Sequence, residues 1–83
     1  MSPTRPAAPS LALASARVGA RLRVTVVDAP HADELAREGV LPGAILEVAS
    51  RTPLGGPVIV TLGRVRLALS GDVAAAVAGE PIA

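Results

Sequence analysis

The stretch TPLGGPVIVTL, residues 52–62, joins a stiff corner to an apolar strand and decides the fold of this chain. Two glycines stand between two prolines, and five uncharged residues rich in Val and Ile follow. Proline fixes the backbone angle φ, glycine reaches conformations that other residues avoid, and β-branched residues favour strands. The stretch therefore predicts a tight turn that leads directly into a buried strand.

A hairpin is predicted immediately after this corner. The runs VIVTL and RVRLALS flank Gly63, and a short glycine turn between two strand-like runs is typical of a β-hairpin. Arg64 and Arg66 are expected to point to solvent. The apolar side chains that we expect to face inward are Val58, Val60, Leu62, Val65, Leu67 and Leu69.

Two more strands are predicted on the N-terminal side of the corner, over residues 21–29 and 45–51. Both show the two-residue alternation of a half-buried strand. In the first strand Leu22, Val24 and Val26 are expected to face inward. In the second strand Leu46 and Val48 are expected to do so.

Two short helices are predicted around these strands. Over residues 30–39, Pro30 suits the first turn and Gly39 suits the left-handed position that ends a helix. Over residues 71–79, Asp72 is the expected N-cap and Gly79 the expected end. Pro81 and Ile82 are expected to add a strand residue or two. Helices this short are unstable alone and must pack on a sheet.

The composition limits the fold to one small domain with an aliphatic core. The chain has 83 residues and contains no Phe, Tyr or Trp, so Val, Leu, Ile and Ala must form the core. Several short strands with glycine and proline corners favour a small, strongly bent barrel of about five strands with two short helices. We expect residues 1–10, with prolines at every third position, to be a flexible tail before a domain over 11–83. A PxxP ligand is the alternative role of that tail.

The charges argue against several classes of function. All eight basic residues are Arg, the formal net charge is only +1, and aromatic residues are absent. A concentrated basic surface and aromatic stacking are what small barrels use to bind nucleic acid, so we expect no nucleic-acid partner. The apolar stretch near the N-terminus is broken by proline, so we expect neither secretion nor membrane insertion and place the chain in the cytoplasm.

The ordered glycines and prolines carry a family resemblance. The segment ELAREGVLPGAILEVASRTPLGGPVIVTLGRVRLALS resembles the FeoA family of small SH3-like proteins in bacterial ferrous iron uptake. The likeness extends over residues 11–80, with Gly39 ending the helix and Gly63 in the hairpin turn. Pro42 with Gly43, and Pro53 with Leu54 and Gly55, match the two corners of the family pattern. Ala36 and Glu38 depart from it, because bulkier apolar residues are common there.

The resemblance implies an SH3-like barrel and an accessory role in ferrous iron transport. The implied partner is a FeoB-type membrane transporter, engaged on its cytoplasmic side, whose assembly or GTP-linked activity the protein would modulate. A detached SH3-like module of an iron-dependent transcriptional regulator is an alternative. A self-assembling interaction protein is another, because open strand edges invite pairing and homo-oligomers.

Catalysis is not expected from this chain, and no cofactor is expected either. A nucleophile needs a neighbouring base, and the chain offers one His, no Cys and no Lys. His31, near Asp28, Asp33 and Glu34, is the only candidate metal ligand and a weak one. The pair Gly55-Gly56 is followed by a strand instead of a helix, so a phosphate site is not expected.

Protein recognition is the function class that remains. The corner places Leu54 at a turn tip, where an apolar side chain has little core to reach, although folding back over a barrel end is the alternative. A rigid loop loses little conformational entropy when it docks. We therefore predict a partner-binding surface, which consists of Leu41, Leu54, Gly55, Gly56 and Pro57. Leu41 precedes a similar corner, and the sequence leaves open whether it lies beside the others.

Overall fold

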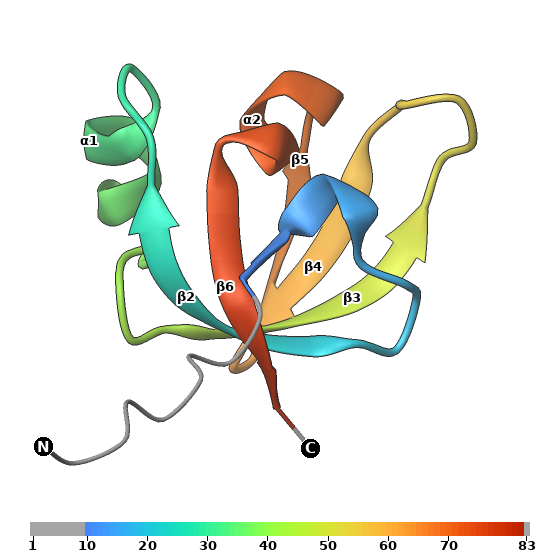
Figure 1. Cartoon of the computed structure of the whole chain (residues 1–83), viewed down its shortest axis with the longest axis horizontal. Helices are drawn as coiled ribbons and strands as arrows, with labels where there is room; N and C mark the ends of the chain where they lie inside the picture. Colours follow the sequence, from blue (N-terminus) through green and yellow to red (C-terminus); the bar gives the residue numbers. More distant parts are fainter. Residues whose placement is uncertain (1–9, 83) are drawn as a thin grey trace, which may run out of the picture.

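The computed structural model describes residues 10–82, which form one curved antiparallel sheet with short helical segments at one end (Figure 1). The strands are β1 (Leu11–Ala12), β2 (Arg21–Val27), β3 (Ile45–Arg51), β4 (Val58–Leu62), β5 (Val65–Leu69) and β6 (Val77–Ile82). The helical segments are the 3₁₀ turn η1 (Leu13–Ser15) and the α-helices α1 (Ala32–Arg37) and α2 (Gly71–Ala75). The mainly β fold with two short α-helices is confirmed. Apart from Ser10, the predicted N-terminal tail lies outside the described residues.

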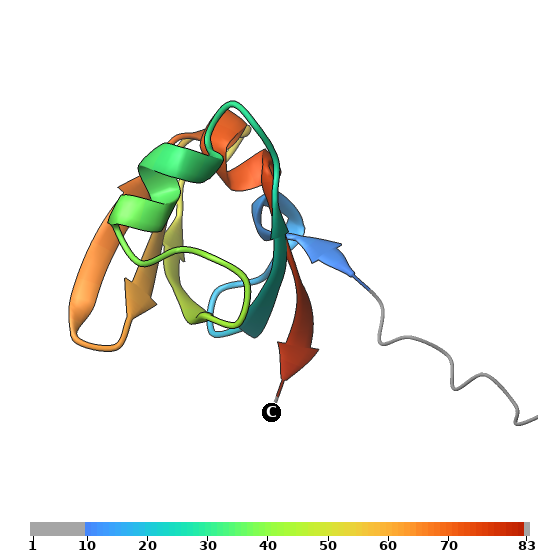
Figure 2. The same ribbon diagram turned by 90° about the vertical axis from the view of Figure 1, so that its left-hand side faces the viewer.

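The sheet has the strand order β1-β6-β2-β3-β4-β5, and every neighbouring pair is antiparallel. It curls so strongly that the β4–β5 hairpin and the β2–β6 pair face each other across the interior (Figure 2). Since β1 and β5 are the two ends of this order, the barrel is not closed by a continuous hydrogen-bond ladder. The described residues contain six strands, against the five or so that the sequence predicts.

The interior is aliphatic throughout, as the composition predicts. The described part of the chain buries no polar or charged side chain, so the core needs no internal hydrogen-bond network. The buried residues are Leu13, Ala16, Leu22, Val24, Leu35, Val40, Leu46, Val48, Val58, Val60, Leu69, Ala74 and Val77. Only two of them come from the α-helices, so these helices cover the core without forming it.

A bulge in β2 changes which valine faces the core. The pairing of β2 with β6 shifts register between Val24 and Val26, which leaves Thr25 as an extra residue. A bulge of this kind reverses the alternation of side chains beyond it. Val26 is therefore 45% exposed and Val27 is half-buried, so the inward orientation predicted for Val26 is wrong. Val65 shares a face of β5 with the buried Leu69, as predicted, but it lies at the hairpin tip beyond the core and is 52% exposed.

The C-terminal segment differs most from its prediction. Helix α2 ends at Ala75, and its N-cap is Ser70, whose hydroxyl accepts a hydrogen bond from the Val73 N–H at 3.3 Å. The expected cap Asp72 lies in the first turn instead. Gly79 does not end a helix but lies inside strand β6, where a Cβ would stand 2.4 Å from the Arg23 carbonyl oxygen. The close approach of β2 therefore explains this glycine.

The remaining predicted elements are confirmed with small changes in length. Helix α1 begins at Ala32, and Gly39 follows its end with a φ of +93°. Strand β3 buries Leu46 and Val48 and exposes Glu47, as the alternation predicts. The hairpin strands β4 and β5 pair across the two-residue turn at Gly63 and Arg64.

Candidate docking surface

The corner of residues 52–57 connects β3 to β4 and projects from the end of the sheet where α1 and α2 lie (Figure 1). The Thr52 N–H donates a hydrogen bond to the Pro57 carbonyl oxygen at 2.9 Å, which closes the base of the loop. Pro53 is followed by Leu54 at a φ of +65° and Gly55 at +76°. A proline followed by a residue at positive φ is the pattern of a type II turn.

Leu54 combines two unfavourable features. Its side chain is fully exposed, so it gains nothing from burial. Its φ lies in the left-handed region, which Gly and Asn accept and a branched apolar residue avoids. The alternative that Leu54 folds back over the barrel end is therefore wrong. Strained residues that nothing in the monomer requires are often found at functional sites.

The loop and its base lie close to neighbouring parts of the chain at three points. A Cβ at Gly56 would stand 2.6 Å from the Thr52 side chain, and a Cβ at Gly71 would stand 2.2 Å from the Gly55 carbonyl oxygen. At the base of the loop, the Arg51 guanidinium donates hydrogen bonds to the carbonyl oxygens of Ala14 and Ala16. The loop therefore packs against the start of α2, and hydrogen bonds link its base to η1.

Leu41 lies apart from this loop. It precedes β3, whereas Leu54 follows β3, so the strand places the two leucines at its opposite ends (Figure 1). Leu41 is 45% exposed and lines a shallow cleft together with the bulged-out Val26 and with Ala36 of α1. The predicted residues therefore form two separate apolar surfaces, with Gly55, Gly56 and Pro57 beside Leu54 and Leu41 on its own.

A larger cleft of about 360 Å³ lies between α1 and β5. The α1 wall carries His31, Glu34 and Glu38, and Ser70 lies where β5 leads into α2. The apolar lining comes from Leu35, Leu67, Ala68, Leu69 and Val73. Sequence reasoning missed this cleft because its two walls are about thirty residues apart. The only indication in the sequence is the spacing of the two glutamates, which places them on one side of the helix.

His31 lines this cleft, half-buried at the start of α1. Over residues 10–82 no group of three or more His, Cys, Asp or Glu side chains is arranged to hold a metal ion. Asp28, Asp33 and Glu34 therefore do not join His31 in a ligand cluster.

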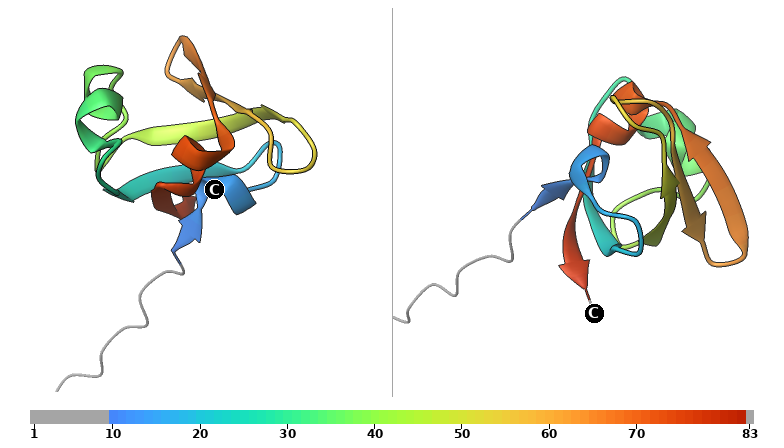
Figure 3. Two further views of the ribbon diagram at one scale, coloured as in Figure 1. Left: turned by 90° about the horizontal axis from the view of Figure 1, so that it is seen from above. Right: turned by 90° about the vertical axis from the view of Figure 1, so that its right-hand side faces the viewer.

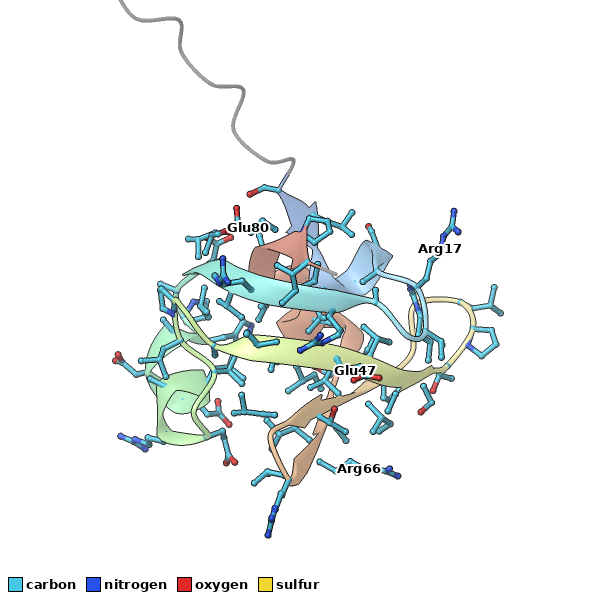
Figure 4. All side chains as sticks on the ribbon, turned by 90° about the horizontal axis from the view of Figure 1, so that it is seen from below. Arg17, Glu47, Arg66 and Glu80 are labelled. Carbon is cyan, nitrogen blue, oxygen red and sulfur yellow. The ribbon has the colours of Figure 1, made fainter. Side chains whose placement is uncertain are left out.

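Charged side chains are spread over the surface. Figure 4 shows Arg17, Glu47, Arg66 and Glu80 pointing outward from different parts of the fold. Glu80 on β6 forms an ion pair with Arg23 on β2 at 3.2 Å, and both side chains are substantially exposed. A pair of this kind contributes about 0–1 kcal/mol to stability. Viewed from above, α1 and the loop of residues 52–57 lie on opposite sides of α2 (Figure 3).

None of the helices in the described range is long and apolar enough to cross a membrane.

Comparison with known proteins identifies the fold and a family. The family model of the FeoA domain matches residues 11–81. The crystal structure of an iron uptake regulatory protein (FeoA) is 27% identical and superimposes with a TM-score of 0.77, over 89% of this chain and 99% of that chain. The solution structure of the FeoA protein from Chlorobium tepidum is 28% identical with a TM-score of 0.77, over 88% of this chain and 71% of that chain.

A regulator shares the same fold. A manganese-dependent transcriptional repressor is 22% identical and superimposes with a TM-score of 0.82. The match covers 93% of this chain but only 44% of the repressor, and at this identity it indicates the fold alone. A search of curated protein sequences finds no match.

Proposed function

This chain belongs to the FeoA family, and from that membership we propose that it is an accessory protein of bacterial ferrous iron uptake. The family model covers nearly the whole described range, and one matching structure is described as an iron uptake regulatory protein. The proposed role is to bind a partner and not to catalyse a reaction. The proposed partner is the cytoplasmic domain of a FeoB-type transporter, whose assembly or GTP-linked activity the protein would modulate. A cytoplasmic location for the chain is part of this proposal.

The contact surface in this proposal is the loop formed by Leu54, Gly55, Gly56 and Pro57. The observation that carries it is the fully exposed Leu54 side chain at a φ of +65°. An apolar side chain that is held outward on a rigid turn can enter a pocket of the partner with little loss of entropy. The Gly55 carbonyl oxygen of this loop lies close against Gly71 at the start of α2.

Leu41 enters the proposal as a separate contact. It lies at the other end of β3, so a partner would have to reach across the sheet to cover both leucines at once. We therefore treat the Leu54 loop as the main contact and test Leu41 independently.

The proposal is tested by isothermal titration of the transporter's cytoplasmic domain with the wild-type chain and three variants. Leu54→Asp should weaken binding at least about tenfold, because a charge would enter an apolar contact. Val65→Asp is the matched control, since Val65 is an exposed apolar residue at the hairpin tip, the opposite end of the sheet. Leu41→Asp decides whether the second surface takes part. Equal binding by wild type and Leu54→Asp would remove the loop from the proposal.

The alternative of a detached regulator module is tested by a gel shift with genomic DNA fragments. If the chain is a transport accessory, no tight complex should form at physiological salt, because the charge is nearly balanced. A tight complex would favour the regulator instead.

A further inference from the structure

Strand β5 has an open edge. It pairs with β4 on one side and is the last strand of the sheet order within residues 10–82. The two-residue turn makes Leu62 and Val65 a hydrogen-bonded pair, and such pairs then alternate along the ladder. The N–H and C=O groups of Arg66 and Ala68 therefore point away from β4. No hydrogen bond outside the ladder uses them in the described part of the chain.

The cleft between α1 and β5 runs beside this edge. Ala68 lines it together with its neighbours Leu67 and Leu69, and Val73 of α2 adds to the apolar lining. A volume of about 360 Å³ accommodates several side chains of an extended segment. An extended segment in this position would have the unpaired backbone groups on one side and an apolar floor below it.

The α1 wall of the cleft carries two glutamates, Glu34 and Glu38, beside His31. Neither Glu34 nor Glu38 forms an ion pair with any residue of the range 10–82. Glu34 lies in the first helical turn, where a negative charge stabilises the helix, but Glu38 is the C-cap, where a negative charge destabilises it. The stability of α1 therefore does not account for Glu38. Both glutamates are exposed, and a basic side chain in the cleft would be attracted to both carboxylates.

We propose that this cleft binds an extended segment of a partner protein, which adds a strand to the open edge of β5. Backbone hydrogen bonds to Arg66 and Ala68 would supply affinity, as in other cases of strand addition. On the face of the segment that points into the cleft, an apolar side chain would contact Leu67 and Leu69. A Lys or Arg two residues away would reach the α1 glutamates. The proposal is independent of the loop at Leu54 and of the transporter.

A second copy of the chain fits the cleft less well than such a segment. Two β5 strands could pair across a two-fold axis, with Arg66 of each copy hydrogen-bonded to Ala68 of the other. Leu67 would then lie opposite Leu67 of the second copy. The face that Leu67 presents to α1 carries only Val65, Leu67 and Leu69, so Arg66 would point away from the glutamates. Charge complementarity therefore favours a partner that has a basic residue on the inward face.

The test begins with a phage-displayed library of random nine-residue peptides, selected on the folded chain. Enriched peptides are synthesised and titrated into ¹⁵N-labelled protein. We expect them to carry a basic and an apolar residue two positions apart and to shift the amide signals of Arg66, Ala68 and α1. Ala68→Pro, which removes the outward N–H, should weaken binding about tenfold, whereas Ala68→Thr should not. Glu34→Gln with Glu38→Gln should weaken it about threefold and reduce its salt dependence.

Two further measurements keep the test decisive. If Ala68→Pro does not fold, peptides methylated on alternate backbone nitrogens replace it, and only one of the two methylation patterns should abolish binding. Leu54→Asp should bind the peptides normally, which separates this proposal from the one for the transporter. The proposal is overturned if no peptide is enriched or if binding does not respond to Ala68→Pro. Enriched peptides that lack a basic residue would also overturn it. So would light scattering that shows dimers of the chain which Ala68→Pro disrupts.

Discussion

Gly71 at the start of α2 lies directly against the carbonyl oxygen of Gly55 in the corner between β3 and β4. A Cβ at Gly71 would stand 2.2 Å from that oxygen, closer than two unbonded atoms can come. The conformation of the exposed corner is therefore coupled to the position of α2. Sixteen positions along the chain separate the two residues, and only the folded sheet brings them together.

Gly71→Ala should displace the corner and destabilise the protein. The added methyl group must push away the Gly55 carbonyl, and overpacking of this kind costs about 1–3 kcal/mol in the free energy of unfolding. Urea denaturation measures the cost, and amide chemical shifts of residues 52–57 report the displacement. Gly43→Ala is the control, because Gly43 has open space but a φ of +96°. It should cost about 1 kcal/mol and leave those shifts unchanged.

Leu54→Asn should stabilise the isolated protein. Asn accepts a positive φ more readily than Leu, and the exposed Leu54 side chain loses no packing when it is replaced. We expect the free energy of unfolding to rise by about 0.5–1 kcal/mol in urea denaturation. Val65→Asn, at an exposed strand position with ordinary φ, should lower it instead. A loss of stability in Leu54→Asn would mean that the leucine contributes to the fold of the monomer.

Gly79→Ala should be strongly destabilising. A Cβ at this buried position would stand 2.4 Å from the Arg23 carbonyl oxygen and 3.2 Å from the Val24 Cα. Both atoms belong to the backbone of β2, which cannot move aside without breaking the β2–β6 ladder. We expect a loss of about 3 kcal/mol, measured by urea denaturation. A cost below about 1 kcal/mol would instead fit a glycine at the end of a helix.

Arg51→Lys should loosen the N-terminal 3₁₀ turn. The Arg51 guanidinium donates to the carbonyl oxygens of Ala14 and Ala16 at once, and an ammonium group cannot reproduce this planar arrangement. The expected cost is about 1–2 kcal/mol, with faster amide hydrogen exchange at η1. Arg64→Lys, at the exposed hairpin turn, should change stability by less than about 0.5 kcal/mol. Unchanged amide exchange at η1 in Arg51→Lys would show that the Arg51 hydrogen bonds are not needed to hold this turn.

Local patterns predicted those elements whose neighbours in space are also neighbours in sequence. The hairpin at Gly63 and the helix that ends before Gly39 follow from turn residues and short-range periodicity. The bulge at Thr25 was not predictable, because it depends on pairing with β6, about fifty residues away. The same pairing turns Gly79 from an apparent helix end into a strand glycine.

The candidate surfaces also divide into those that local sequence predicts and those that depend on distant parts of the chain. Leu54 was predicted as an exposed apolar residue because its turn is local, and the structure confirms its exposure. The separation of Leu54 from Leu41 could not be predicted locally, because it depends on the length and direction of β3. The cleft between α1 and β5 required the curvature of the whole sheet, so no short window of the sequence contains it.

The aliphatic core and the series of stiff corners between short strands follow from composition and turn chemistry, which act over a few residues. The tertiary structure alone decided the contact of Gly71 with the corner, the direction in which Val26 faces, and the open edge beside α1. These features arise from pairing between distant strands, where backbone approach and hydrogen bonding outweigh local preference.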